Sequence, residues 1–405
     1  MHEIDVAVMG AGAAGIAAAR RLTDARVPCV LIEARNRLGG RAHTLPGDFA
    51  LDLGCGWLHS ADENDWAALA PKLGFKIDDY PPPWARPAWE GNFSAAEQKE
   101  YWAAWRKFYE KVEAAEDDDI PLSHCFEPGN RFNPMLGAVI TYANGAEAEK
   151  ITTREYALYH DTNKNQRIER GYGTLIATYA AGLDVRLDCP VSLIDHSGER
   201  LRVVTPHGEL SARAAIVAVP PGVIANGTLR FSPELPAKLG AAHALPLGVA
   251  NKAFLRIDRP DDLPKDTRVT GSRVTQETGM YTLRAFGRPV IEGYFGGSFA
   301  ASLEGEITPF AIEQLCAALG NDIAKRLTPI AESAWARDPY ALGSYSYGSL
   351  GAAAARAALA APVDERLFFA GEHCSPHDFS TAHGAFRTGV KAADDAIRTL
   401  QAQPA

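Results

Sequence analysis

Residues 4–15 read Ile4-Asp-Val-Ala-Val-Met9-Gly10-Ala-Gly12-Ala-Ala-Gly15, and this stretch decides the fold. A short run of apolar and β-branched residues that ends at a glycine turn is typical of a buried strand. The alanine-rich residues that follow predict a helix up to position 22, and the apolar residues 30–32 predict a second strand. Strand, turn, helix and strand in this order indicate a βαβ unit with parallel strands.

The glycine pattern G-x-G-x-x-G in the turn is typical of dinucleotide-binding folds. Gly10 permits the tight turn, Gly12 lets a pyrophosphate approach the backbone, and Gly15 lets the helix pack against the strand. Ala14 lies in the first helical turn, where unpaired N–H groups attract phosphate. Glu33 follows the second strand, where its carboxylate can bind ribose hydroxyl groups. We therefore expect a dinucleotide whose ribose is not phosphorylated.

Later strand candidates are short, apolar and bounded by turn residues. They lie at 185–187, 201–204, 215–219 and 367–370. A sheet that begins at the N-terminus and includes a strand near the C-terminus makes its domain discontinuous, so the segments between form a second domain. In those segments we expect strands at 249–257 and 290–295 and helices at 94–115 and 309–327.

The predicted fold class is α/β, with a discontinuous, Rossmann-like dinucleotide-binding domain and an inserted α+β substrate-binding domain. The first domain is expected to comprise residues 1–80, 185–235 and 335–405, and the second residues 81–184 and 236–334.

The predicted helix at 94–115 begins with a capping box, in which Ser94 precedes Glu97 by three residues. Large apolar side chains recur on one face of it, and such a stripe is typical of packing in a protein core. We interpret these residues as core: Tyr101, Trp102, Trp105, Phe108, Tyr109 and Val112.

The net charge of the chain indicates which classes of binding partner to expect. The 405 residues include 41 Lys and Arg against 50 Asp and Glu, a formal net charge of −9. An acidic protein repels phosphate backbones and anionic membranes, so we expect neither nucleic acid nor a membrane as partner. The sequence leaves a homodimer open.

The six cysteines are scattered along the chain, without a pair or cluster at metal-ligand spacing. We expect free thiols and no metal site. The N-terminus lacks the pattern of a secretory signal, and no segment is as long and apolar as a spanning helix. A cytoplasmic location is the resulting expectation.

Three further segments carry a resemblance to a known family. The first follows the ribose carboxylate and reads Glu33-Ala34-Arg35-Asn-Arg37-Leu-Gly39-Gly40-Arg41. The others lie near the C-terminus and include Gly343-Ser344-Tyr345-Ser346-Tyr347 and Gly371-Glu372-His373-Cys374, which runs on to Ser380-Thr381-Ala382. Together they resemble the flavin-containing amine oxidase family, which includes monoamine oxidases and histone demethylases, and within it the polyamine-oxidase branch. The resemblance implies FAD as cofactor and amine oxidation as activity.

The resemblance also implies which residues hold FAD. Arg41 should contact the pyrophosphate, Glu372 the ribityl-pyrophosphate region and Val191 the adenine. Thr381 and Ala382 should lie at a helix N-terminus that faces the flavin ring, where the helix dipole stabilises negative charge. The implied set is Gly10, Gly12, Ala14, Gly15, Glu33, Ala34, Arg35, Gly39, Gly40, Arg41, Gly56, Trp57, Val191, Trp335, Gly371, Glu372, Thr381 and Ala382.

Two positions differ from the animal monoamine oxidases. Ser344 stands where those enzymes carry a cysteine bonded to the flavin, so the FAD should be non-covalent. Thr381 stands where they carry the second tyrosine of an aromatic cage, which leaves Tyr345 as half of that cage.

The catalytic residues implied by the resemblance are Lys252, His59, Tyr345 and Thr381. Lys252 should be buried and hold a water beside flavin N5, and a neutral His59 should order water or the substrate nitrogen. His373 and His383 are interpreted as structural.

The expected reaction is oxidation of a primary or secondary amine at its α-carbon. Hydride passes to flavin N5, the imine is hydrolysed, and oxygen reoxidises FAD and yields hydrogen peroxide. Polyamines and hydrophobic monoamines are both candidate substrates, with Glu63, Asp65, Asp78 and Asp79 as candidate anchors for a polyamine.

Alternative functions are an L-amino acid oxidase and a flavin desaturase of an apolar substrate. The first needs a pocket arginine that the sequence alone does not identify. The second predicts neither the lysine nor the G-S-Y-S-Y segment. A non-catalytic flavin-binding module is a third reading.

Overall fold

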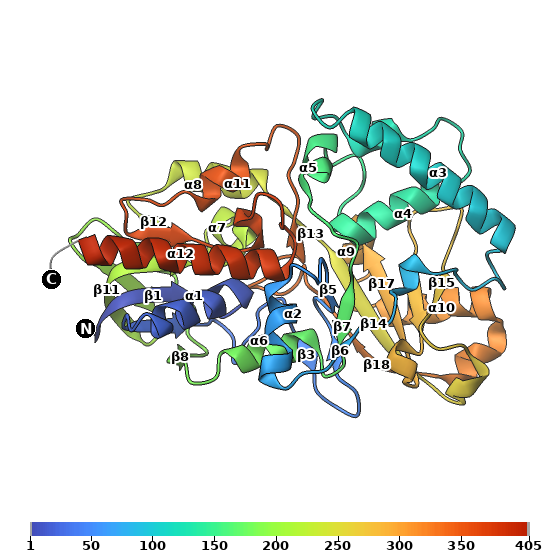
Figure 1. The fold of residues 1–405 in the computed structure, drawn as a ribbon, viewed down its shortest axis with the longest axis horizontal. Helices are drawn as coiled ribbons and strands as arrows, with labels where there is room; N and C mark the ends of the chain where they lie inside the picture. The colour runs from blue at the N-terminus through green and yellow to red at the C-terminus, as the bar shows by residue number, and fades with distance from the viewer. Residues whose placement is uncertain (1, 403–405) are drawn as a thin grey trace.

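The structure is a computed structural model that describes residues 2–402. It is elongated and has two parts, and both ends of the described chain lie at the outer end of the part on the left of Figure 1.

The left-hand part is organised around a sheet of eight strands within residues 2–402. The strands β1 (His2–Met9), β2 (Cys29–Ile32) and β8 (Val185–Arg186) are parallel, and β1 also pairs in parallel with β11 (Gly208–Val217). The sheet is completed by β9 (Leu193–Asp195), β10 (Leu201–Thr205), β12 (Arg230–Ser232) and β20 (Leu367–Phe369). The predicted Rossmann-like α/β arrangement is therefore confirmed, including the strand contributed from near the C-terminus.

Helices cover both faces of this sheet, because alternate residues of a strand point to opposite faces. Val6 and Val8 pack into one core with α1 (Ala13–Asp24) and α12 (Ala382–Ala402), which lie side by side in Figure 1. Ala7 and Met9 pack into a second core on the other face. Its helices are α7 (Pro221–Ala225), α8 (Pro236–Ala244) and α11 (Ala355–Ala360).

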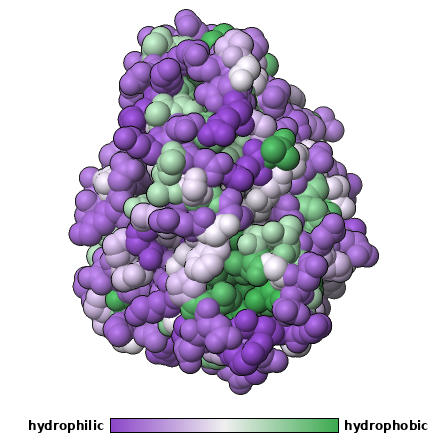
Figure 2. Space-filling view, turned by 90° about the vertical axis from the view of Figure 1, so that its right-hand side faces the viewer, coloured by the Kyte–Doolittle hydropathy of each residue, from purple (hydrophilic) through white to green (hydrophobic). Residues whose placement is uncertain are grey.

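The right-hand part contains an antiparallel sheet formed by five strands of the described chain. Their order is β15 (Thr267–Thr270), β16 (Met280–Leu283), β17 (Val290–Gly296), β14 (Ala250–Ile257) and β18 (Leu327–Glu332). One face packs against α9 (Gly297–Ser302) and α10 (Ile307–Leu319). The outer end of this part is mostly hydrophilic, with an apolar area in the lower half of Figure 2.

The predicted helix at 309–327 is wrong at its C-terminal end. Helix α10 stops at Leu319, and a 3₁₀ turn (Asn321–Arg326) leads into β18. Gly320 has φ of +95°, a conformation that residues with a side chain rarely adopt, and it ends the helix.

A third core lies under α3 (Ala95–Ala114), α4 (Asn133–Asn144) and α5 (Thr153–Leu158). The predicted capping box is present, since Glu97 N–H donates to Ser94 Oγ and the Glu97 carboxylate accepts from Ser94 N–H. Phe108 and Val112 of the aromatic stripe are fully buried there, as expected.

Several short elements join the two parts. They are β3 (Thr44–Leu45) with β4 (Leu51–Asp52), β5 (Trp57–Leu58) with β7 (Gln166–Ile168) and β6 (Ile77–Asp78), α2 (Asp65–Leu69) and α6 (Tyr172–Tyr179). Helices α6 and α8 pack with the cores of the large sheet, although both lie in segments that the sequence assigns to the second domain. The domain limits themselves stay a prediction.

All six cysteines are free thiols, as expected. Within residues 2–402, no helix is both long enough and apolar enough to cross a membrane.

Candidate active site

A continuous cavity of about 1120 Å³ runs between the two parts. One end is lined by the glycine turn after β1 and by Glu33. The other end is lined by aromatic side chains of α3, α4 and the five-stranded sheet. All of the cofactor residues implied by the sequence line this cavity except Gly15, which packs behind the turn.

The glycines of the turn differ in what surrounds them. A Cβ on Gly15 would lie 1.8 Å from the carbonyl oxygen of Gly10, and one on Gly10 would lie 2.6 Å from that of Ala218. At Gly12 the nearest protein atom would be 3.9 Å away, so its backbone faces open space in the cavity. The N-terminus of α1 thus leaves room for a phosphate, as a dinucleotide site requires.

Glu33 lies at the end of β2 and is buried. Its Oε2 accepts a hydrogen bond from Ala11 N–H at 2.7 Å, and its Oε1 accepts one from Arg35 N–H at 3.0 Å. Oε1 also lies 3.5 Å from Nη1 of Arg35, whereas Oε2 keeps a second lone pair that can accept from a ribose hydroxyl. The guanidinium of Arg35 is paired with Asp338, and this pairing was not visible in the sequence.

Arg41 and Glu372 form an ion pair on the cavity wall, with Arg41 Nη1 2.8 Å from Glu372 Oε1. Glu372 also accepts hydrogen bonds from the Ser346 hydroxyl at 2.6 Å and from Ser380 N–H at 3.0 Å. Burial opposes ionisation of this carboxyl, but the positive charges of Arg41, His373 and Arg356 and the hydrogen bond from Ser346 together outweigh it and lower the pKa to about 2. Glu372 is therefore a fixed negative charge.

Thr381 caps the N-terminus of α12, where the sequence places it. Its hydroxyl accepts a hydrogen bond from Gly384 N–H at 3.0 Å and donates one to the Asp378 carbonyl at 2.6 Å. Thr381, Ala382 and the next turn line the cavity, so the positive end of the helix dipole faces it.

Lys252 lies on β14, is 6% exposed, and lines the cavity. Its Nζ lies 2.8 Å from Oε1 of Glu292 on β17. Burial lowers the pKa of this ammonium, but the charge and hydrogen bond of Glu292, together with Asp52 and Tyr294, more than compensate, and the net effect raises the pKa. A Cβ on Gly56 would lie 3.2 Å from Nζ, so this glycine leaves room for the ammonium group. The predicted burial of Lys252 is confirmed, and its counter-charge Glu292 was missed.

Tyr345 lies on β19 (Tyr345–Ser346), which pairs with β13 (Leu247–Gly248). Its hydroxyl donates to the backbone carbonyl of Tyr142 at 2.5 Å and lies 3.1 Å from the hydroxyl of Tyr294. Burial raises the pKa of Tyr345, which keeps the phenol neutral. Tyr345 therefore contacts a second tyrosine, Tyr294, through their hydroxyl groups.

His59 lies on the cavity with Nδ1 2.6 Å from Oδ1 of Asn165. Burial lowers the pKa of this imidazole, so it is neutral at pH 7. A carboxamide oxygen can only accept, so Nδ1 carries the proton and Nε2 carries the lone pair. Trp57 and Trp84 are also on the wall, with ring centroids 4.4 Å apart.

The aromatic stripe of α3 is only partly core, which corrects the interpretation from the sequence. Trp102, Trp105 and Tyr109 line the cavity, and Tyr109 is 44% exposed. Periodicity identifies a buried face but does not say whether protein or a cavity lies against it. The sequence also gave no signal for these lining residues: Trp84, Tyr142, Tyr156, Tyr159, Arg167, Arg268, Met280 and Tyr294.

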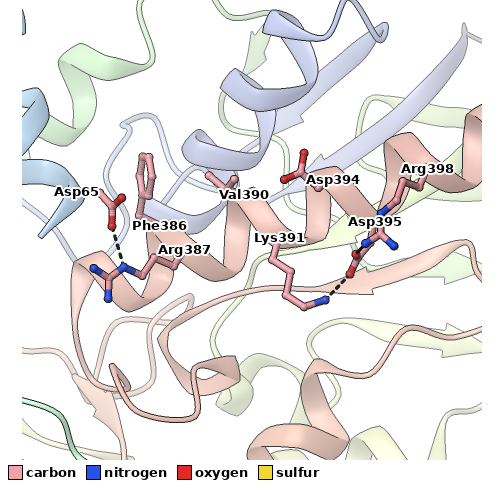
Figure 3. Close-up of a pocket in the computed structure, with 8 residues that line it drawn as sticks. All are labelled: Asp65, Phe386, Arg387, Val390, Lys391, Asp394, Asp395 and Arg398. Atoms are coloured by element: carbon pink, nitrogen blue, oxygen red, sulfur yellow. Dashed lines mark hydrogen bonds and ion pairs between the residues drawn. The ribbon is translucent and has the colours of Figure 1, made fainter. Parts of the chain in front are cut away.

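The four acidic anchors suggested by the sequence are not on the cavity wall of the described chain. Glu63 pairs with His160, and Asp78 pairs with Arg167. Asp65 pairs with Arg387 at 2.9 Å in a separate surface hollow along α12, where Lys391 and Asp395 also pair (Figure 3). The carboxylates of Glu63, Asp65 and Asp78 are used in ion pairs of the fold, and Asp79 is exposed.

Comparisons with known proteins agree with this geometry. The profile described as "Flavin containing amine oxidoreductase" matches residues 13–110 and 79–397. The chain is similar to Polyamine oxidase 4 of Oryza sativa subsp. japonica, with 30% identity over 98% of this chain and 89% of the other. It is likewise similar to Polyamine oxidase 2 of Arabidopsis thaliana, with 31% identity over the same shares.

A solved structure of a putrescine oxidase double mutant superposes with a TM-score of 0.79 at 19% identity, covering 98% of this chain and 99% of the other. That likeness supports the fold, and the two polyamine oxidases fit the branch predicted from the C-terminal motifs. The chain therefore belongs to the flavin-containing amine oxidoreductase family, whose members use FAD to oxidise amines, as the sequence predicts.

Proposed function

We propose that the protein oxidises a primary or secondary amine to an imine, which water hydrolyses to an aldehyde, and that oxygen accepts the two electrons and becomes hydrogen peroxide. The observation that carries the proposal is the continuous cavity. It joins the dinucleotide turn at Gly12 to an aromatic chamber that contains Lys252, Tyr294 and Tyr345. FAD, when bound, supplies the hydride acceptor.

The residues that would hold FAD fit a dinucleotide in their chemistry. The open backbone at Gly12 suits a pyrophosphate, and Glu33 suits a ribose. Ser344 is used in the fold, because its hydroxyl accepts from Ala250 N–H at 2.7 Å and donates to the Ala250 carbonyl at 3.0 Å. A serine offers no thiol to bond to a flavin, which supports non-covalent FAD.

The aromatic chamber would bind the amine and exclude water. An amine in solution is mostly an ammonium ion, and only its neutral form has the free electron pair that the reaction requires. Burial among Trp57, Tyr294 and Tyr345 disfavours the charged form and so lowers the pKa of the bound amine. His59 offers a lone pair on Nε2 that can order water or the substrate nitrogen.

Lys252 would hold a water molecule at the end of the cavity that Gly56 and Trp57 line. Its ammonium donates up to three hydrogen bonds, of which Glu292 takes one. The remaining donors can bind water and stabilise negative charge as oxygen is reduced.

An anaerobic titration of the purified holoprotein tests the proposal. Polyamines, alkylamines, arylalkylamines and L-amino acids are added while the absorbance of oxidised flavin is followed, and peroxide is then measured after air is admitted. Bleaching by an amine class, with peroxide formed on reoxidation, is expected. A yellow protein that no amine bleaches would contradict it and leave the desaturase alternative.

We further propose a cytoplasmic location and the absence of nucleic-acid partners. The six free thiols and the net charge of −9 support these proposals. A homodimer is a further proposal, and the molar mass in solution by light scattering tests it.

A further inference from the structure

A buried cation without a counter-charge lies in the wall of the aromatic chamber. Arg268, on β15, is 6% exposed and lines the cavity. Its guanidinium forms no hydrogen bond or ion pair with any residue from 2 to 402, and its Nε is fully buried. Burial lowers the pKa of Arg268, and the groups whose charge opposes this are the phenols of Tyr101 and Tyr142.

The other buried cations of the chamber are all paired. Lys252 forms an ion pair with Glu292, and Arg167 forms ion pairs with both Asp78 and Asp266. An unpaired buried charge costs several kcal/mol, which is why arginines in protein interiors normally have an acidic partner. Buried charges that lack a partner within the protein are found mainly at functional sites. The missing partner of Arg268 is therefore best sought in a ligand.

The sheet places Arg268 at a distance from Lys252. The strand order β15-β16-β17-β14 puts the two residues on strands that are three steps apart, or about 14 Å at the usual strand spacing. Arg268 pairs in register with Thr282, and Thr282 with Glu292, so these side chains share the face that lines the cavity. Tyr142 neighbours both residues' surroundings, because its ring centroid lies 6.0 Å from that of Tyr294 and its phenol interacts electrostatically with Arg268.

We propose that Arg268 binds a carboxylate at the far end of the substrate, so that the amine and the carboxylate are separated by several carbon atoms. The inference rests on the proposed function, which sets the amine near Lys252 and Tyr345. A guanidinium matches a carboxylate with two parallel hydrogen bonds. The same cation repels a distal ammonium, which disfavours a linear diamine of similar length.

Steady-state oxidation of compounds of matched length by the aerobic holoprotein, with anaerobic bleaching of the flavin by each compound, tests this. The panel contains hexylamine, 1,6-hexanediamine and 6-aminohexanoate. It also contains the shorter homologues 4-aminobutanoate and 5-aminopentanoate. We expect kcat/KM for the best terminal amino acid to exceed that for hexylamine by about ten- to a hundredfold, the usual effect of a charged hydrogen bond. If hexanediamine is preferred, the inference fails and the proposed function stands. If no compound bleaches the flavin, the proposed function itself fails.

The variant Arg268→Gln separates binding from structure. It should raise KM for the terminal amino acid about ten- to a hundredfold more than it raises KM for hexylamine. Hexanoate, which has no amine, should perturb the flavin spectrum of the wild type and not of this variant. Because an unpaired buried charge is removed, Tm should stay equal or rise, whereas a purely structural arginine would lower Tm when replaced.

Arg273→Gln is the matched control. Arg273 lies five residues further along, pairs with Glu97 and does not line the cavity of the described chain. It removes the same charge, so equal effects of the two variants on the terminal amino acid would point to the net charge of the protein and overturn the role of Arg268.

Discussion

Lys252 shows how a single residue combines burial with charge. Its ammonium is kept ionised by Glu292 on the next strand, and the missing side chain at Gly56 leaves space beside it. A lysine in that setting can hold water and stabilise negative charge, but only while the carboxylate compensates its own burial.

The variant Lys252→Met should slow reoxidation of the reduced protein by oxygen roughly a hundredfold, because a preorganised donor is lost where negative charge develops. Stopped-flow mixing of reduced protein with oxygen measures the rate. Lys265→Met, at an exposed position, is the control. Unchanged oxygen and amine kinetics in Lys252→Met would remove this residue from the mechanism.

Ionisation of the single residue Glu372 makes the free energy of unfolding depend on pH. Its pKa in the folded protein is about 2, below the ordinary value of 4.5. Ionisation therefore stabilises the fold fully above about pH 4.5, and the stabilisation is lost as the pH falls towards 2. Glu372→Gln should lower the free energy of unfolding by roughly 3 kcal/mol at pH 7.

Urea unfolding of both proteins between pH 7 and pH 3 provides the test. The difference between wild type and Glu372→Gln should shrink below pH 4.5, whereas Glu306→Gln, at an exposed position, should show almost no difference. If the difference in the free energy of unfolding grew as the pH fell, the pKa of Glu372 would not be lowered in the folded protein.

At the scale of elements, the turn between β1 and α1 contains one glycine that folding requires and another that leaves room for a ligand. Gly15 is needed for the helix to approach the strand, and Gly12 is not crowded by any protein atom. The two glycines belong to one motif, yet the structure assigns them different physical roles.

Gly12→Ala should fold with a Tm close to that of the wild-type apoprotein but bind FAD at least tenfold more weakly, because its methyl group occupies the open space of the turn. Gly15→Ala should fail to fold or lose several kcal/mol, because its Cβ would overlap the Gly10 carbonyl. Thermal unfolding of apoprotein and titration with FAD measure both. Equal FAD affinity in Gly12→Ala and wild type would argue against a phosphate at this turn.

At the scale of the whole molecule, the cavity lies between two separately packed parts. The large sheet has its own cores, and the five-stranded sheet has another. A ligand that touches both Glu33 and the Lys252 end therefore links them, and its binding adds to the stability of the whole chain.

Adding FAD to apoprotein should raise Tm, by an amount that corresponds to about 2.7 kcal/mol when free FAD is a hundred times its Kd. Differential scanning fluorimetry over a range of FAD concentrations measures this. FMN is the control, since it lacks the adenosine expected between Glu33 and Val191, and it should stabilise less. Equal stabilisation by FMN would contradict the binding of adenosine between Glu33 and Val191.

The sequence by itself determined the βαβ unit, the dinucleotide turn, the discontinuous sheet and the family, because these depend on local spacing and on motifs. It also identified Lys252 and Tyr345 as members of one site. Only the tertiary structure decided their partners, Glu292 and Tyr294, which strand pairing brings together from distant positions. It likewise decided that Trp102 and Trp105 face a cavity and that Arg268 is buried without a counter-charge. Contacts between distant segments follow from packing and register, and the local pattern of a chain does not contain them.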